Sequence, residues 1–210
     1  MTIADTIADE HYGDRVATAM AFARILNQEA RELAGLGVDV IQFDEPAFNV
    51  YLDQVQDWGI EALHAAIEGV SCKTAVHICY GYGIDANRAW KESLGDQWRQ
   101  YEDMFPALNA SRIDQVSLEC ANSRVSLELI GLLPDKGVLV GAIDVASDTI
   151  ETPDQVAATI RAALAHVAPE HLFPCTNCGM VPLRRDVVLA ALGAGAGAAI
   201  VREELGASSA

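Results

Sequence analysis

The alternation of short β-branched segments with longer helical segments is the feature that most constrains how this chain can fold. Strands are expected at residues 38–43, 73–79, 115–119, 137–143 and 172–174. Helices are expected at residues 14–35, 51–67, 85–107, 125–133 and 184–194, and a further helix should start at 152–154. Residues 198–201 fit either a terminal strand or a helix. Strands that alternate with helices predict an α/β fold with a parallel sheet and crossover helices.

Polar residues gather where the predicted strands end. They are Asp44 and Glu45, His77 and Cys79, Glu119, Asp144, and Cys175 and Cys178. Because the carboxyl ends of the strands carry the chemistry in (β/α) barrels, this placement favours a TIM-type barrel. A doubly wound open sheet is the alternative, but no glycine-rich fingerprint follows the first expected strand. Five strands are expected, whereas a closed barrel has eight.

The charge of the chain excludes several classes of partner. Its 210 residues include 14 Lys and Arg against 30 Asp and Glu, so the formal net charge is −16. Such a protein would repel a phosphate backbone or an anionic lipid surface, and we expect neither nucleic acid nor membrane as a partner. Apolar runs stay shorter than the ~18–20 residues of a membrane helix. The acidic start of the chain does not resemble a signal peptide, which predicts a cytoplasmic protein.

The five cysteines are expected to be reduced. An odd number of cysteines in a chain without a signal peptide argues against a disulfide framework. The pair Cys175 and Cys178 has three interpretations: half of a structural zinc site, a redox pair, or one metal ligand beside a bystander. A second Cys-x-x-Cys and a thioredoxin-like context are both missing, which favours the last interpretation. Whether Cys175 contributes to a metal site stays open.

His77 and Cys79 are the sharpest local signal in the sequence. Residues i and i+2 of a strand point to the same side, so both side chains should reach one space. A buried core histidine beside a small apolar cysteine is the alternative. Glu119 ends another expected strand, where it is either a capped carboxylate or an oxygen ligand. One imidazole, one or two thiolates and one carboxylate suit zinc, whereas magnesium and calcium prefer oxygen ligands alone.

A zinc site with sulfur ligands favours one reaction class. A free alkyl thiol has a pKa near ~8.5 and is mostly protonated at neutral pH. Coordination to zinc removes its proton, and a catalytic zinc keeps or opens a position for substrate. Thiolate ligands also make the metal electron-rich, which favours a bound nucleophilic thiolate over activated water. We therefore expect alkylation of a substrate thiol rather than hydrolysis.

Five short segments in this order carry a family resemblance: residues 41–47 (IQFDEPA), 77–81 (HICYG), 118–119 (LE), 141–144 (GAID) and 177–180 (NCGM). With these spacings the chain resembles the catalytic C-terminal barrel of the cobalamin-independent methionine synthase family, and most closely its short single-domain forms. Each segment alone is a weak signal, but the set is specific and spans nearly the whole chain.

The resemblance implies a TIM-type barrel, a catalytic zinc ion and transfer of a methyl group to homocysteine to form methionine. Residues 1–205 would then be the C-terminal part of the barrel and residues 206–210 a tail. The family's zinc ligands match His77, Cys79, Glu119 and Cys178, and Glu119 would be the ligand that yields to the substrate sulfur. Asp44 matches the acid that binds the homocysteine ammonium group, while Glu45, Asn122 and Ser123 are further expected substrate contacts. Without the resemblance, capping of the strand end would be the preferred role for Asp44 and Glu45.

Departures from the family pattern affect the expected methyl donor. The family barrel has strands before the segment that resembles residues 1–5, which predicts a barrel incomplete at the N-terminus. Ala146 stands where the full-length enzymes have a histidine that helps to protonate a leaving amine. The donor is therefore expected to be either a methyl-folate or a methylated partner protein or corrinoid. A homo-oligomer is one arrangement that would cover the missing strands.

Two rival functions remain on the sequence alone. One keeps the zinc but methylates or alkylates another small thiol such as coenzyme M, in which case a basic residue should replace the acid at Asp44. The other is a non-catalytic zinc-binding fragment that needs a partner chain.

Overall fold

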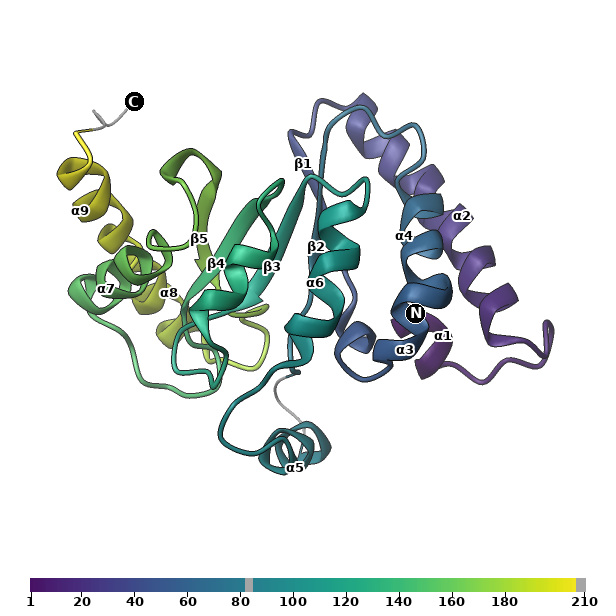
Figure 1. The fold of residues 1–210 in the computed structure, drawn as a ribbon, viewed down its shortest axis with the longest axis horizontal. Helices are drawn as coiled ribbons and strands as arrows, with labels where there is room; N and C mark the ends of the chain where they lie inside the picture. Colours follow the sequence, from purple (N-terminus) through teal and green to yellow (C-terminus); the bar gives the residue numbers. More distant parts are fainter. Residues whose placement is uncertain (82–84, 207–210) are drawn as a thin grey trace. The chain divides into compact units, whose positions relative to one another are not determined.

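Five strands joined by helices confirm the expected α/β architecture. The computed structural model describes residues 1–81 and 85–206. Within them the hydrogen-bonded strand order is β1-β2-β3-β4-β5 (Figure 1). β1 pairs with β2 and β4 pairs with β5, both in parallel. The strands are β1 (Val40–Asp44), β2 (Lys73–His77), β3 (Gln115–Glu119), β4 (Gly137–Ile143) and β5 (Leu172–Thr176).

The chain forms two compact units. Unit 1 comprises Met1–Ile78 and Gln100–Val116, and unit 2 comprises Cys79–Arg99 and Ser117–Ala210. Unit 1 contains α1 (Thr2–Thr6), α2 (Arg15–Gly35), a 3-10 helix (Pro46–Asn49), α3 (Leu52–Gln54), a π-helical turn (Val55–Gly59), α4 (Ile60–Ala66) and α6 (Gln100–Ala110). Unit 2 contains α5 (Asp85–Ser93), 3-10 helices at Leu127–Leu132 and Pro169–His171, α7 (Pro153–Ala163), α8 (Arg185–Gly193) and α9 (Ala196–Glu204).

The helices of unit 1 pack on one another through small side chains. α2 begins where expected, because the Asp14 carboxylate accepts a hydrogen bond from the Ala17 amide and caps the helix. Ala23 and Ala30 of α2 are buried, and α2 lies beside α4 (Figure 1). The expected helix at 51–67 is interrupted by the π-helical turn. A Cβ atom on Gly59, at the end of that turn, would lie 2.6 Å from the sulfur of Met1 and 3.2 Å from Cε1 of Phe48, so a larger residue there would require the Met1 side chain to move.

In unit 2, α7 is likewise capped and packed through a small residue. α7 begins where expected, because Thr152 caps the helix and the side chain of Gln155 completes a capping box. α7 packs against α9 (Figure 1). A Cβ atom on Gly197 would lie 2.4 Å from the Pro153 carbonyl oxygen, so only glycine allows this close approach. Residues 198–201, which fitted either a strand or a helix, belong to α9.

Two helix predictions were wrong. The helix expected at 85–107 is two helices, because Gly95 has a positive φ of 78° and the Trp98 amide donates to the Arg124 carbonyl at 2.9 Å. That pairing draws residue 98 into a β-bridge with Val125. The helix expected at 125–133 is a 3-10 helix that begins only at Leu127, because residue 125 is held in the same bridge. In both cases a contact between distant residues overrides local propensity.

The described residues contain no helix that is both long enough and apolar enough to cross a membrane. Of the expected tail at 206–210, Gly206 follows α9 with a positive φ of 72°, and residues 207–210 lie outside the described part of the chain.

Candidate metal centre

The predicted site residues of unit 1 stand at the carboxyl ends of β1 and β2. Asp44 and His77 are the last residues of these strands and lie opposite each other in the parallel register. The Glu45 amide then donates to the His77 carbonyl at 2.8 Å. His77 is buried, whereas Asp44 is exposed and accepts a hydrogen bond from Gln42 at 2.9 Å. The register therefore places an accessible carboxylate and a buried imidazole at the same end of this strand pair.

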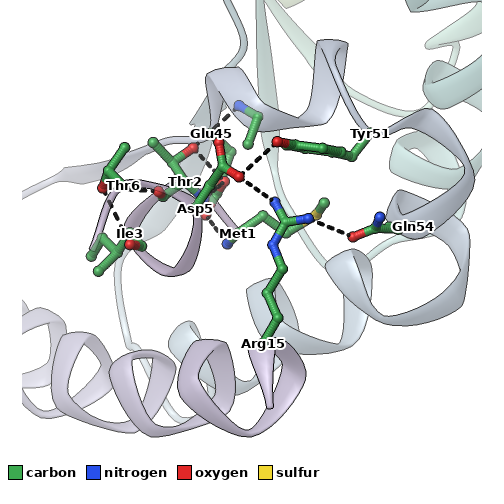
Figure 2. A network of polar contacts seen from close by, with 10 residues as sticks. Met1, Thr2, Ile3, Asp5, Thr6, Arg15, Glu45, Tyr51 and Gln54 are labelled. Atoms are coloured by element: carbon green, nitrogen blue, oxygen red, sulfur yellow. Dashed lines mark hydrogen bonds and ion pairs between the residues drawn. The ribbon is translucent and has the colours of Figure 1, made fainter. Parts of the chain in front are cut away.

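Glu45 binds the start of the chain in this structure. Its carboxylate accepts from the Met1 ammonium group at 2.8 Å, and from the amide and the hydroxyl of Thr2 at 3.0 Å and 2.9 Å (Figure 2). The Thr2 hydroxyl also accepts from the Ala47 amide at 3.2 Å. Glu45 thus anchors α1, and Asp44 is the more accessible of the two acids. A substrate-binding role for either acid stays a prediction.

The polar network drawn around Glu45 extends to a second carboxylate. Asp5 accepts from the guanidinium of Arg15 at 3.0 Å and from the hydroxyl of Tyr51 at 2.6 Å (Figure 2). The hydrogen bond to Asp5 raises the pKa of Tyr51. Arg15 also lies over the Tyr51 ring at 4.0 Å and binds Gln54. These groups hold α1, α2 and α3 together, so this network has a structural role.

Unit 2 contains three further predicted ligands, two thiols and a carboxylate. Cys79 is buried and Cys178 is half-buried. Glu119 is fully buried. Its carboxylate accepts a hydrogen bond at 2.7 Å from the amide of Tyr80, the residue that follows Cys79. The hydrogen bond with Cys178 raises the pKa of the Cys79 thiol, and burial and the negative charges of Cys178 and Glu119 raise it further. A bound cation would offset this concentration of negative charge and deprotonate the thiols.

The ligand atoms of His77, Cys79 and Cys178 all lie within 4.8 Å of one another. The strand expected at 73–79 ends at His77, so Cys79 lies two residues beyond β2 rather than on it. An imidazole nitrogen and two thiols form a donor set that fits zinc. Glu119 does not belong to this group of three. Its carboxylate accepts a hydrogen bond from the amide of Tyr80, the residue that follows Cys79. The structure thus presents a candidate His/Cys/Cys metal site, and Glu119 as a fourth ligand stays a prediction.

Cys175 is not part of this group in the described residues. Burial raises its pKa to about 12, although a hydrogen bond with Ser117 acts in the opposite direction. Burial also raises the pKa of the neighbouring Cys120 thiol. The position of Cys175 outside the group of His77, Cys79 and Cys178 favours its interpretation as a bystander to Cys178.

Asn122 and Ser123 form the turn that follows β3. Asn122 is exposed and has a φ of 50°, a left-handed conformation that asparagine tolerates better than most residues. The Ser123 hydroxyl donates to the Glu119 carbonyl at 3.2 Å and accepts from the Val125 amide at 3.2 Å. In this structure Ser123 therefore stabilises the turn, and contact of either residue with substrate stays a prediction.

Sequence reasoning assigned no role to Asn177, although it is fully buried beside Cys178. Its side chain binds the backbone of Cys120 and Ala121, the two residues that follow Glu119. A polar residue directly before a candidate ligand at a strand end was the signal available in the sequence. The backbone of Cys178 is held in addition by Thr176, whose hydroxyl donates to the Cys178 carbonyl at 2.7 Å.

Comparison with known families settles what kind of domain carries this site. Residues 1–200 match the family model described as the catalytic domain of cobalamin-independent synthases. The chain belongs to this family. Its members include proteins named methionine synthase from Sulfurisphaera tokodaii, 31% identical over 205 residues, and from Saccharolobus islandicus, 32% identical over 207 residues. Each alignment covers 97% of this chain, but the chain spans only 55% and 57% of these relatives.

A solved structure from the same family shows the same fold. The B12-independent methionine synthase from Shewanella sp. W3-18-1, in complex with selenomethionine, is 59% identical and superposes with a TM-score of 0.95. The match covers 99% of this chain and 61% of that one. A protein from Listeria monocytogenes is 16% identical with a TM-score of 0.62 and supports the fold alone. The expected fold of the cobalamin-independent synthase barrel is therefore confirmed, and the doubly wound alternative is not favoured.

Proposed function

We propose that this chain carries the zinc-binding part of a cobalamin-independent methyltransferase that methylates homocysteine to form methionine. The cluster of His77, Cys79 and Cys178 beside the buried Glu119 is the observation that carries the proposal. Membership of the synthase family supports it, as does the complex of the Shewanella protein with selenomethionine, the selenium analogue of the product. In this proposal residues 1–205 form part of the catalytic barrel and residues 206–210 a tail.

The four proposed ligands combine the chemistry that thiol methylation needs. Zinc held by His77, Cys79, Cys178 and Glu119 would supply the deprotonation of the substrate thiol at neutral pH. Glu119 is the ligand that we expect to give way to the substrate sulfur. The amide of Tyr80 donates to its carboxylate and so compensates part of the cost of burying that charge.

The acidic strand end of unit 1 favours an amino-acid thiol as the substrate. Asp44 and Glu45 follow β1, and Asp44 is exposed opposite His77 in the strand register. A carboxylate there would bind the ammonium group of homocysteine through a charge-assisted hydrogen bond. The sulfonate of coenzyme M would instead require a cationic side chain. The acidic pair therefore supports homocysteine over such a thiol.

The methyl donor is proposed to be a methyl-folate or a methylated corrinoid or partner protein. The side chain of Ala146 has no proton to give to a departing amine, and its amide only donates to Asp144 at 2.9 Å. This favours a donor whose leaving group needs no protonation. A cytoplasmic location fits the five free cysteines, and a homo-oligomer or another partner chain stays part of the proposal.

Zinc analysis combined with an activity assay tests the proposed function. The wild-type chain and Cys79→Ser are purified without chelator, and zinc is measured by mass spectrometry. We expect about one zinc per wild-type chain and a large loss in the variant. Zinc-loaded protein is then incubated with homocysteine and each donor, and methionine is quantified. A folded wild type that contains and binds no zinc would exclude the function. A zinc-loaded chain that forms no methionine with any donor would favour the zinc-binding fragment that needs a partner.

A further inference from the structure

Asn177 uses both ends of its side-chain amide on the segment directly after Glu119. Its Oδ1 atom accepts from the Cys120 amide at 3.1 Å and from the Ala121 amide at 3.3 Å. Its Nδ2 atom donates to the Ala121 carbonyl at 2.7 Å. The side chain is completely buried, so these bonds are made without competition from solvent. An aspartate, serine or leucine at this position could not make the same set of three bonds.

β4 is shaped to admit this side chain. A Cβ atom on Gly141 would lie 2.4 Å from Oδ1 and 2.8 Å from Cα of Asn177, so only glycine leaves room for it. The Gly141 carbonyl accepts from the same two amides, those of Cys120 and Ala121, at 3.1 Å and 2.8 Å. The pairing of β4 with β5 also shifts by one residue between Gly141 and Ile143. Such irregularities re-aim side chains and are enriched beside functional sites.

The clamp formed by Asn177 lies one residue away from two of the proposed metal ligands. Cys178 follows Asn177, and Glu119 precedes Cys120. Because consecutive Cα atoms are about 3.8 Å apart, fixing Asn177 against Cys120 also restricts the positions of Cys178 and Glu119. The backbone amide of Asn177 adds a further bond, to the Ile143 carbonyl at 2.8 Å. Three strand ends are therefore tied together directly beside the ligands.

We propose that Asn177 is a positioning residue of the metal centre, which sets the separation of Cys178 from Glu119. The inference rests on the proposed zinc-dependent function and extends it to a residue that is not itself a ligand. A buried asparagine with a purely structural role would contribute to folding stability alone. A positioning residue also controls the affinity for the metal and the geometry of the bound thiolates.

Three measurements on the full chain separate these roles. Asn177→Ala is compared with wild type for zinc affinity by chelator competition, for the visible spectrum of the cobalt(II)-loaded protein, and for Tm. We expect zinc binding to weaken about ten- to hundredfold and the thiolate-to-cobalt absorption to change. Asn27→Ala is the matched control, because Asn27 also donates to backbone carbonyls, those of Ala66 and Glu68, but lies on α2. The control should lower Tm and leave zinc affinity and the cobalt spectrum unchanged.

The outcomes distinguish the positioning role from the function on which it rests. A folded Asn177→Ala protein with zinc affinity within about threefold of wild type and an unchanged cobalt spectrum would overturn the positioning role alone. A folded wild type that binds no zinc would overturn the proposed function. If Asn177→Ala does not fold, Asn177→Ser is measured against the same criteria, because serine keeps an acceptor for one of the two amides.

Discussion

At the scale of single residues, the site depends on how Glu119 is held. Its carboxylate is buried at the end of β3 and accepts a hydrogen bond from the Tyr80 amide. Its position is therefore set by a backbone group next to Cys79. The same amide can also donate to an uncharged carbonyl oxygen, although that hydrogen bond is weaker than one to a carboxylate. Charge and position can therefore be separated experimentally at this residue.

Glu119→Gln should keep the hydrogen bond from Tyr80 but lose the negative charge that favours zinc. We expect zinc affinity to fall by about tenfold or more, since loss of a ligand costs at least as much as loss of a supporting residue. The metal-free protein should be no less stable than wild type, because a buried charge has been removed. Chelator competition and urea unfolding measure the two effects.

Glu128→Gln provides the control for this substitution. Glu128 is an exposed acid that lies 3.7 Å from Arg99, and surface ion pairs contribute little to stability. It should therefore leave zinc affinity unchanged. Equal zinc affinity in Glu119→Gln and wild type would remove Glu119 from the ligand set.

At the scale of helices and strands, local signals and distant contacts determined different elements. The start of α7 at Thr152 could be predicted from the sequence, because a cap acts within three residues of itself. The break after Ser93 could not, because it depends on the bridge between Trp98 and Val125. The role of Gly197 was also hidden, because the atoms that crowd it belong to α7.

Gly197→Ala should weaken the packing of α9 on α7. The new Cβ atom would lie 2.4 Å from the Pro153 carbonyl oxygen and 2.9 Å from the Ala157 nitrogen, both backbone atoms that cannot rotate away. We expect a loss of about 1–3 kcal/mol in the free energy of unfolding. Urea denaturation of the purified chain measures it.

The matched substitution is Gly193→Ala at the end of α8. A Cβ atom there would meet no atom within 4 Å, and alanine is a better helix former than glycine by about 1 kcal/mol. This variant should be as stable as wild type or more so. A Gly197→Ala protein that is equally stable would show that α7 and α9 are not closely packed.

At the scale of the whole molecule, metal binding and folding should be linked. Cys79 and Cys178 belong to distant parts of the sequence, so the site exists only in the folded chain. A ligand that binds only the folded state stabilises it, by about 2.7 kcal/mol when its free concentration is 100 times its Kd. Loss of the metal should correspondingly lower the stability of the protein.

Chelation of zinc should therefore lower Tm, and zinc added back should restore it. Differential scanning calorimetry with and without chelator measures the change in Tm. The Tm of Cys79→Ser should change little when chelator or zinc is added. A zinc-containing wild type whose Tm does not respond to chelator would indicate that the metal is held equally well by the unfolded chain.

The sequence by itself determined the alternation of strands and helices, the starts of α2 and α7, and the proximity of His77 to Cys79. These features depend on residues close together in the chain, where periodicity and capping act. The approach of Cys178 to Cys79 was expected from the family resemblance but not from local pattern. Only the tertiary structure decided that residues 198–201 are helical and that Asn177 holds the segment after Glu119. Each of these depends on strand register or helix packing, which bring together residues that are distant in the sequence.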